Sequence, residues 1–451
     1  MATALILLAA GKGTRMQSDL PKVLHEVGNA PLLHHAMMSA AAIEPEKMVV
    51  VAGHGSDAVA AAARAYDPDV EVVLQTEQLG TAHAVEQARN ALQGFEGNAL
   101  VLYGDTPFIR PETLEAMLAA RTKHAVVVLG FEAADPARYG RLVTNGETLE
   151  RIVEYKDATE AECAITLCNS GVIAADCATL FELLTEVRDD NAAGEYYLTD
   201  IPELARKRGL SSGVVRCDEA ETLGINSRAE LASAEAIFQS RMRVEAIENG
   251  VALQAPDTVH FSADTALGRG CTIEPNVVFA PGVTVETGAR IRAFSHLEGC
   301  HVARGAVVGP YARLRLGTEV SEDVKIGNFV EVKNATLAEG AKVNHLSYIG
   351  DAEIGEASNI GAGTITCNYD GVLKHKTTIG ARVFVGSNTM LVAPVTLGDD
   401  AMTASGSVIT RDVPATDLAV ARARQENKAG LAVKLFEKLK AIKAMRQKDG
   451  L

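Results

Sequence analysis

The stretch LGRGCTIEPNVVFAPGVTVETGARIRAFSHL, residues 267–297, decides the fold of the second half of the chain. An aliphatic or aromatic residue recurs here at every sixth position, as Leu267, Ile273, Phe279, Val285, Ile291 and Leu297. Neither the 3.6-residue period of an α-helix nor the two-residue period of a strand gives this spacing. A six-residue period is typical of a parallel β-helix, in which each hexad forms one short face and its apolar residue points inward.

The same spacing continues far beyond this stretch, with single-residue slips. Its further positions are Val302, Val308, Leu314, Val320, Ile326, Val332, Leu337, Val343, Ile349, Ile354, Ile360, Ile379, Val385, Leu391, Leu397, Thr403 and Ile409. One long break separates Ile360 from Ile379. Because no coil can bury its apolar face alone, the coils must stack. We therefore predict a left-handed parallel β-helix over residues 250–425, since known left-handed hexapeptide helices use three hexads per coil.

Composition limits the possible functions of the 451-residue chain. It has 43 basic and 58 acidic residues and a net charge of −15, so no basic surplus exists to neutralise nucleic-acid phosphates. Seven cysteines without a CxxC pair indicate free thiols in a reducing compartment. The apolar run at residues 3–10 is too short to span a membrane and does not resemble a signal segment. We expect a cytoplasmic protein without nucleic-acid or membrane partners.

The first half alternates apolar runs of strand length with helical stretches rich in Ala, Leu and Glu. The predicted strands are 3–10, 48–52, 70–74, 99–103 and 125–130, and the predicted helices are 33–42, 82–92 and 111–120. This alternation predicts βαβ units in a doubly wound, Rossmann-like sheet. Ligands in such sheets bind at the carboxyl ends of the strands.

The remaining segments set the expected domain boundaries. Residues 227–249 carry an apolar stripe at helical spacing and end at Asn249-Gly250, which predicts a linker helix. Residues 426–451 mix lysines with Leu, Phe and Ile, which predicts a basic amphipathic helical tail for capping or packing. The expected domains are therefore 1–226, the linker helix 227–249, the β-helix 250–425 and the tail 426–451.

A glycine-rich loop, Gly11-Lys12-Gly13-Thr14-Arg15-Met16, follows the first strand. It lacks the earlier glycine of a Walker A loop, and Met16 stands where GxGxxG requires glycine. Freed backbone amides beside Lys12 and Arg15 would suit a phosphate. An ordinary glycine turn explains the same residues.

Further motifs carry a resemblance to a known family. They are LAAGKGTRM at 8–16, Pro21-Lys22, Gln75 with Leu79-Gly80-Thr81-Ala82, Tyr103-Gly104-Asp105, Tyr139-Gly140-Arg141, Glu154-Tyr155-Lys156, Asn169-Ser170-Gly171, the run from Glu195 to Asp200, and Gly224-Ile225-Asn226. This set resembles sugar-1-phosphate nucleotidyltransferases. Joined to the hexads, nearly the whole chain resembles the bacterial family of bifunctional N-acetylglucosamine-1-phosphate uridylyltransferases and glucosamine-1-phosphate acetyltransferases.

For the first half, the resemblance implies transfer of UMP from UTP to N-acetylglucosamine-1-phosphate. The nucleotide-sugar site would comprise Leu8, Ala9, Ala10, Gly11, Lys22, Gln75, Gly80, Thr81, Tyr103, Gly104, Asp105, Gly140, Glu154, Asn169 and Asn226. Arg15 and Lys22 would hold the triphosphate and the pyrophosphate, and Asp105 with Asn226 would bind Mg²⁺ as cofactor. By themselves, Asp105 also suits a turn after a strand and Asn226 a helix N-cap.

For the second half, the resemblance implies transfer of acetyl from acetyl-CoA to glucosamine-1-phosphate in a homotrimer. His345 would be the catalytic base, a task suited to a group that titrates near neutrality. Substrate contacts would be Arg315, Lys333, Tyr348 and Asn359, and acetyl-CoA contacts Ala362, Asn368, Tyr369, Ser387, Ser405 and Arg422. Ser405 departs from the alanine common in the family, and Arg424 could replace Arg422.

Two other functions use the same folds. The first is a monofunctional sugar-1-phosphate nucleotidyltransferase whose β-helix serves only for assembly. His345, Lys333 and Arg315 argue against it, because a scaffold needs none of them. The second is a regulatory binding protein without catalysis, which could dispense with Asp105 and Lys22.

Overall fold

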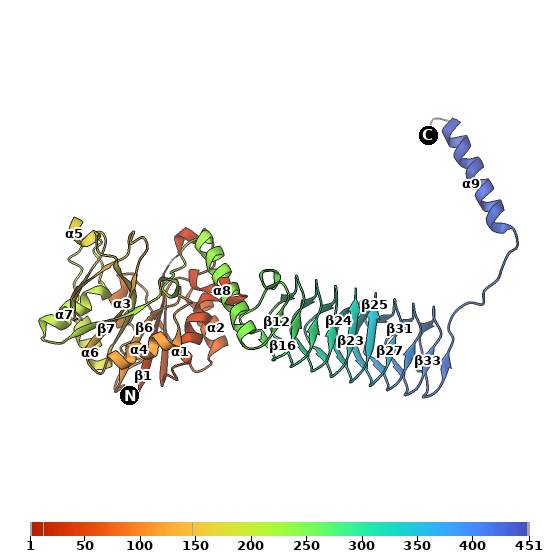
Figure 1. The fold of residues 1–451 in the computed structure, drawn as a ribbon, viewed down its shortest axis with the longest axis horizontal. Coiled ribbons are helices and arrows are strands. Elements are labelled where there is room, and N and C mark those ends of the chain that lie inside the picture. The colour runs from red at the N-terminus through yellow and green to blue at the C-terminus, as the bar shows by residue number, and fades with distance from the viewer. Residues whose placement is uncertain (1, 12, 147, 449–451) are drawn as a thin grey trace. The chain divides into compact units, whose positions relative to one another are not determined.

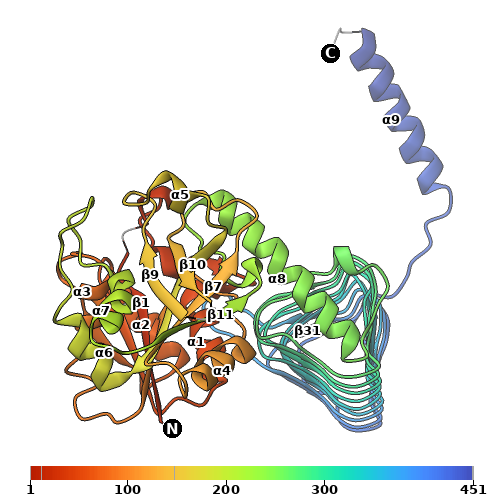
Figure 2. The same ribbon diagram turned by 60° about the vertical axis from the view of Figure 1, so that its left-hand side comes forward.

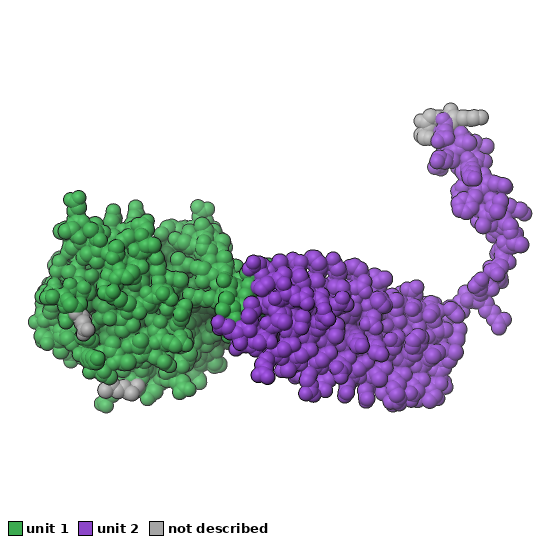
Figure 3. All heavy atoms as spheres, viewed as in Figure 1, with its two compact units in different colours: residues 1–245, 260–264 green, residues 246–259, 265–451 purple. Residues whose placement is uncertain are grey.

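The computed structural model describes residues 2–11, 13–146 and 148–448. Lys12 of the glycine-rich loop and residues 449–451 of the expected tail lie outside the described residues. The chain forms two compact units, one of Met1–Glu245 with His260–Asp264 and one of Ala246–Val259 with Thr265–Leu451 (Figure 3). The division falls inside helix α8 (Arg228–Glu248), which occupies the segment expected to be a linker helix.

Unit 1 contains a nine-stranded sheet in the order β5-β4-β1-β6-β10-β7-β11-β9-β8 (Figure 1). Its strands are β1 (Thr3–Ala9), β4 (Lys47–Ala52), β5 (Glu71–Leu74), β6 (Asn98–Tyr103), β7 (Val126–Glu132), β8 (Arg141–Asn145), β9 (Thr148–Val153), β10 (Leu167–Asp176) and β11 (Ser212–Cys217). Strand β1 lies parallel between β4 and β6, whereas β10 runs antiparallel to β6 and β7. A separate hairpin pairs β2 (Glu26–Val27) with β3 (Ala30–Pro31).

Two apolar cores cover the two faces of this sheet, which explains the uninterrupted apolar run of β1. Ala4, Ile6 and Leu8 belong to one core, and Leu5 and Leu7 belong to the other. The covering helices are α1 (Leu32–Ala41), α2 (Ser56–Tyr66), α3 (Thr81–Glu86), α4 (Pro111–Ala120), α6 (Cys177–Leu184) and α7 (Ile201–Lys207). A further short helix, α5 (Glu160–Cys163), buries none of its residues.

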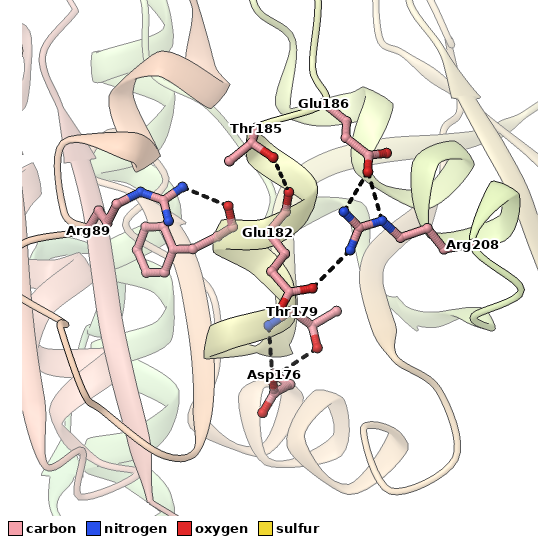
Figure 4. A network of polar contacts seen from close by, with 8 residues as sticks. Arg89, Asp176, Thr179, Glu182, Thr185, Glu186 and Arg208 are labelled. Atoms are coloured by element: carbon pink, nitrogen blue, oxygen red, sulfur yellow. Dashed lines mark hydrogen bonds and ion pairs between the residues drawn. The ribbon is translucent and has the colours of Figure 1, made fainter.

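The helix expected over 82–92 is shorter in the structure, because α3 ends at Glu86. Beyond it the chain tightens into turns, with amides bonding three residues back, as in Gln87 to Ala84 and Arg89 to Glu86. The Arg89 guanidinium donates to the Phe181 carbonyl of α6 at 2.7 Å, and Arg208 bonds Glu182 and Glu186 (Figure 4). These contacts fix α6 against its neighbours, and Asp176 caps the helix by accepting from the Thr179 amide.

Unit 2 contains the predicted left-handed parallel β-helix, whose coils superimpose as nested triangles in Figure 2. Its strands are β12 (Ala252–Leu253), β13 (Ala266–Leu267), β14 (Thr272–Ile273), β15 (Val278–Phe279), β16 (Val283–Val285), β17 (Arg290–Ile291), β18 (His296–Leu297), β19 (Cys300–Val302), β20 (Val307–Val308), β21 (Arg313–Leu314), β22 (Thr318–Val320), β23 (Lys325–Asn328), β24 (Glu331–Leu337), β25 (Lys342–His345), β26 (Tyr348–Ile354), β27 (Asn359–Ile360), β28 (Ile365–Cys367), β29 (Thr377–Ile379), β30 (Phe384–Val385), β31 (Met390–Val392), β32 (Val395–Leu397), β33 (Met402–Thr403), β34 (Val408–Ile409) and β35 (Leu418–Ala419).

The hexad residues fill the interior of the coils, as the sequence predicts. Ile273, Ile291 and Val308 are among those with no exposed surface, whereas Leu267 at the first coil is half-buried. The break in the rhythm contains one ordinary coil face, β28, whose buried Thr366 pairs with Leu391. After it, residues 368–376 form a loop outside the coils, the excluded loop, in which Tyr369 bridges Lys374. The stack therefore keeps its register across the insertion.

The tail forms helix α9 (Leu431–Lys448). Within the described part of the chain, no helix combines the length and apolarity needed to cross a membrane. All seven cysteines are free. Burial raises the pKa of Cys177 to about 11 and, with nearby carboxylates adding to the effect, that of Cys217 to about 12.

Candidate active sites

A cavity of about 310 Å³ opens at the carboxyl ends of β1 and β6. From β1 the chain adds β4 and β5 on one side and β6 on the other, so β1 lies at the switch point of the sheet. Open α/β sheets bind ligands at this position. Many of the predicted nucleotide-sugar residues line the cavity: Leu8, Ala9, Ala10, Gly11, Lys22, Gln75, Gly80, Thr81, Tyr103 and Asp105. Sequence reasoning missed Val23, Gln78, Ala84 and Glu195, which also line it.

Lys22, Asp105 and Asn226 meet although they are far apart in the sequence. The Lys22 ammonium forms an ion pair with the Asp105 carboxylate and donates to Asn226 Oδ1 at 3.0 Å. A backbone hydrogen bond of 3.0 Å from the Ile225 amide to the Asp105 carbonyl brings Asn226 to this point. Ser227, not Asn226, accepts the amide of Glu230 at the start of α8, so the alternative role as a helix cap falls to the neighbouring residue.

The same two side chains fit a hard divalent cation. A carboxylate and an amide oxygen already converge on one cationic nitrogen, and Mg²⁺ prefers oxygen ligands of this kind. Within the described residues, no group of three or more His, Cys, Asp or Glu side chains could hold a metal ion. A magnesium ion here would therefore take its remaining ligands from substrate phosphates and water.

A second group fixes the wall of the cavity around Gly80. The Gln75 side chain donates to the Gly80 carbonyl at 3.1 Å, and Thr81 Oγ1 accepts the Leu198 amide at 2.9 Å. Gly80 has a φ of +120°, and a Cβ there would lie 2.4 Å from the Tyr196 carbonyl oxygen. Only glycine allows this approach.

Gly140, Glu154 and Asn169 form a third group in unit 1. The Gly140 carbonyl accepts the Asn169 amide at 2.8 Å, and a Cβ on Gly140 would lie 3.5 Å from a Glu154 carboxylate oxygen. Thr199 donates to Glu154 at 3.2 Å. Burial raises the pKa of Glu154, and the Thr199 hydrogen bond partly opposes this. Thr199 belongs to the run Glu195–Asp200, one of the motifs that resemble the family, so it could have been found from the sequence.

Six predicted residues of unit 1 do not line this cavity: Arg15, Gly104, Gly140, Glu154, Asn169 and Asn226. Arg15 lies exposed on a short 3-10 helix (Thr14–Met16), and a Cβ on Gly104 would lie 3.3 Å from the Leu33 and Val23 side chains. Their predicted contacts with the nucleotide stay predictions.

In unit 2, three cations gather on the outer surface of the β-helix. Lys333 lies one coil above Arg315, whose guanidinium bonds Glu331 at 2.8 Å. Lys374 of the excluded loop approaches Lys333, and this contact, together with the charge of Arg315, lowers the pKa of Lys333. A cluster of three cations suits an anionic ligand. The sequence analysis missed Lys374, although it lies within the one break in the hexad rhythm.

His345 ends β25 and is exposed. Its Nδ1 atom lies 3.1 Å from Oδ1 of Asn328, which pairs with it from the preceding coil. With the amide oxygen as acceptor, Nδ1 carries the proton and Nε2 is free to accept another. Asn328 was not predicted, but counting back one coil from His345 would have found it. Tyr348 begins the next strand, β26, and Asn359 lies on β27, the next coil above β25.

The predicted acetyl-CoA residues lie on later coils and on the excluded loop. The Ala362 carbonyl accepts the Asn388 amide at 2.7 Å, and the Ser387 carbonyl accepts the Gly406 amide at 2.8 Å. Asn368 donates to Asp351, and the Tyr369 hydroxyl donates to the Gly371 carbonyl at 2.6 Å. The Ser405 carbonyl accepts from Arg422 at 2.8 Å. The structure thus brings Ser405 and Arg422 together, and the acetyl-CoA contacts stay predictions.

Comparison with known families defines the class. Residues 5–173 match the MobA-like NTP transferase domain, and residues 376–411 match the bacterial transferase hexapeptide (six repeats). A nucleotidyltransferase fold with a cavity at its switch point, followed by a hexapeptide β-helix, defines a transferase with two catalytic parts.

Curated relatives extend over the whole chain. The chain is 68% identical over 449 residues to the bifunctional protein GlmU of Ruegeria pomeroyi, covering 100% of both proteins. It is 67% identical to that of Cereibacter sphaeroides and 64% identical to that of Jannaschia sp., covering 99% of this chain and 98% of either relative. The chain belongs to the family of bifunctional GlmU proteins and is a bifunctional transferase.

Proposed function

We propose that unit 2 acetylates glucosamine-1-phosphate with acetyl-CoA and that unit 1 then transfers UMP from UTP to the N-acetylglucosamine-1-phosphate formed. The observation that carries the proposal is the convergence of Lys22, Asp105 and Asn226 at the cavity of unit 1. The free thiols support the expectation of a reducing compartment, the cytoplasm.

In unit 1, the acceptor phosphate oxygen attacks the α-phosphorus of UTP, and pyrophosphate leaves with the electrons of the broken P–O bond. Lys22 would move from Asp105 to the phosphates, since its ammonium suits the charge that develops there. Asp105 and Asn226 would hold Mg²⁺, which neutralises phosphate charge when bound. Gln75 and Thr81 would bind the uracil ring, and Gly140, Glu154 and Asn169 the acetylated sugar.

In unit 2, the sugar amine attacks the thioester carbonyl. A C–N bond forms, the C–S bond breaks and coenzyme A leaves as the thiol. His345 Nε2 takes a proton from the amine, because the hydrogen bond to Asn328 keeps the other proton on Nδ1. Arg315, Lys333 and Lys374 would bind the sugar phosphate, whose charge offsets their mutual repulsion.

We also propose that the chain acts as a homotrimer. Phe294, Tyr311, Phe329 and Leu346 form an apolar ladder along one corner of the β-helix, between 47% and 61% exposed. Neighbouring aromatic rings stack with centroids 4.9 and 5.3 Å apart. All four residues have positive φ, a conformation that costs a bulky residue about 1–2 kcal/mol. An exposed apolar ladder supports contact with other copies.

Two assays on one preparation test the proposal. Wild type should release pyrophosphate from UTP and N-acetylglucosamine-1-phosphate, and free thiol from acetyl-CoA and glucosamine-1-phosphate. D105A should lose only the first activity and H345A only the second, so each variant is the control for the other. Thiol release that persists in H345A would refute the role of His345, and absence of thiol release from wild type would favour the monofunctional alternative.

A further inference from the structure

Arg141 is a buried arginine in unit 1 to which the proposed function assigns no role. It begins β8 and is only 2% exposed. Four of its hydrogen bonds go to backbone carbonyls: Nη1 donates to Pro136 at 3.2 Å and to Tyr139, and Nη2 to Ala137 at 3.1 Å and Cys163 at 3.5 Å. The buried Nε has no hydrogen-bond partner among the described residues. Burying a guanidinium is costly unless its donors are satisfied, so its presence calls for an explanation.

The carbonyls bound by Arg141 belong to two separate loops. Pro136, Ala137 and Tyr139 form the turn that leads into Gly140, and Cys163 ends α5 in the loop that follows Glu154. Ala137 has a φ of +36°, which is unfavourable for alanine. The guanidinium therefore holds a strained turn in place through a planar array of donors, a geometry that lysine cannot reproduce.

The position of this turn decides where Gly140 lies. Gly140 follows it directly, bonds the Asn169 amide through its carbonyl and lies beside the Glu154 carboxylate. Strand β8 also pairs with both β9 and β10, through Arg141 to Val153 and Arg141 to Cys168. Arg141 thus lies at the junction of the three segments that carry the third group of unit 1.

We propose that Arg141 is a positioning residue for the acceptor sugar: it fixes the 136–139 turn so that Gly140, Glu154 and Asn169 present one binding surface. The proposal rests on the proposed function, in which these three residues bind the acetylated sugar. It assigns Arg141 no contact with substrate. The predicted uracil and triphosphate contacts, Gln75, Thr81, Arg15 and Lys22, lie on segments that the 136–139 turn does not include.

The test is steady-state pyrophosphate release by R141K, with each substrate varied in turn. Losing alignment of one or two hydrogen bonds to the sugar should raise the KM for N-acetylglucosamine-1-phosphate about tenfold. The KM for UTP should stay within about twofold of wild type, because only the acceptor side is displaced. Thiol release from acetyl-CoA, measured on the same sample, reports active-enzyme concentration independently of unit 1.

A second variant keeps the proposal testable if R141K does not fold. Asp135 is exposed and its carboxylate accepts the Ala137 amide at 3.1 Å, so D135A loosens the same turn from outside. It should raise the acceptor KM in the same selective way, by a smaller factor. In R141A, added ethylguanidinium should lower the acceptor KM towards wild type, which simple destabilisation would not produce.

The outcomes distinguish failure of the proposed function from failure of the proposed role of Arg141. If wild type releases no pyrophosphate, the proposed function fails. If wild type is active and R141K changes neither KM, or raises both equally, Arg141 only stabilises the fold and the positioning role is wrong. If R141K cannot be purified folded, an unchanged acceptor KM in D135A overturns the proposal.

Discussion

Replacing Asn328 by alanine tests whether one hydrogen bond orients the proposed base. The Asn328 amide oxygen lies 3.1 Å from His345 Nδ1, and His345 is exposed, so little else restrains its ring. A neutral hydrogen bond contributes about 0.5–1.5 kcal/mol. Without this hydrogen bond, the imidazole of His345 can adopt other rotamers and the other tautomer, so we expect the activation free energy of acetyl transfer to rise by about 1–2 kcal/mol. That cost corresponds to a five- to thirtyfold fall in kcat/KM for acetyl transfer.

The assay is thiol release from acetyl-CoA as a function of pH, for wild type, N328A and N328D. The aspartate keeps an acceptor at the same place and adds a negative charge, which stabilises the protonated imidazole. N328D should therefore recover most of the rate at high pH, with the rising limb of the profile moved to higher pH. Pyrophosphate release should be unchanged in both variants. A kcat/KM for N328A equal to that of wild type would refute this reasoning.

Three further predictions concern unit 1. G80A should lose about 1–3 kcal/mol of stability, because Gly80 adopts a φ of +120° and a Cβ there would overlap Tyr196. We also expect pyrophosphate release by G80A to be at least tenfold slower. An unchanged thermal unfolding temperature would contradict the predicted loss of stability. Burial, reinforced by Glu203, raises the pKa of Asp200 from 3.8 to about 6, so the folded state binds the extra proton and stability falls as pH rises through this window. After allowance for solvent screening, D200N should remove about 1 kcal/mol of this dependence in urea titrations, and an unchanged pH slope would show that another group is responsible. A fragment of residues 1–226 should be about 3 kcal/mol less stable than a fragment of residues 1–248, because it lacks Phe238, which packs in a cluster with Phe108 and Ile225. Equal unfolding midpoints of the two fragments in urea would show that α8 contributes nothing to the stability of unit 1.

The fold of unit 2 was predictable because the six-residue spacing of apolar residues along the sequence directly gives the stacking of its coils. Each buried hexad residue, such as Ile291, contacts only its own and neighbouring coils, so spacing in the sequence maps directly onto position in space. The sheet of unit 1 was less accessible. Its parallel strands were evident from apolar runs, but β10 enters antiparallel between β6 and β7, and no local pattern encodes that long-range pairing.

The candidate sites divide in the same way. Lys22, Asp105 and Asn226 were predicted through motif resemblance, and the structure brings them together through a backbone contact from Ile225 that the sequence does not reveal. Asn328 was within reach of the hexad register. Lys374 was harder to find, because its approach to Lys333 depends on how the excluded loop folds back.

The excluded loop, residues 368–376, allows this architecture to change locally. Because β28 and β29, on either side of residues 368–376, both keep their parallel pairing with β26, the loop behaves as a side branch on a ladder. Lengthening or exchanging this loop leaves the strand pairing of the coils above and below it unchanged. New ligand contacts can therefore be added at this point without a new folding problem, and the scaffold and the specificity of the site can vary separately.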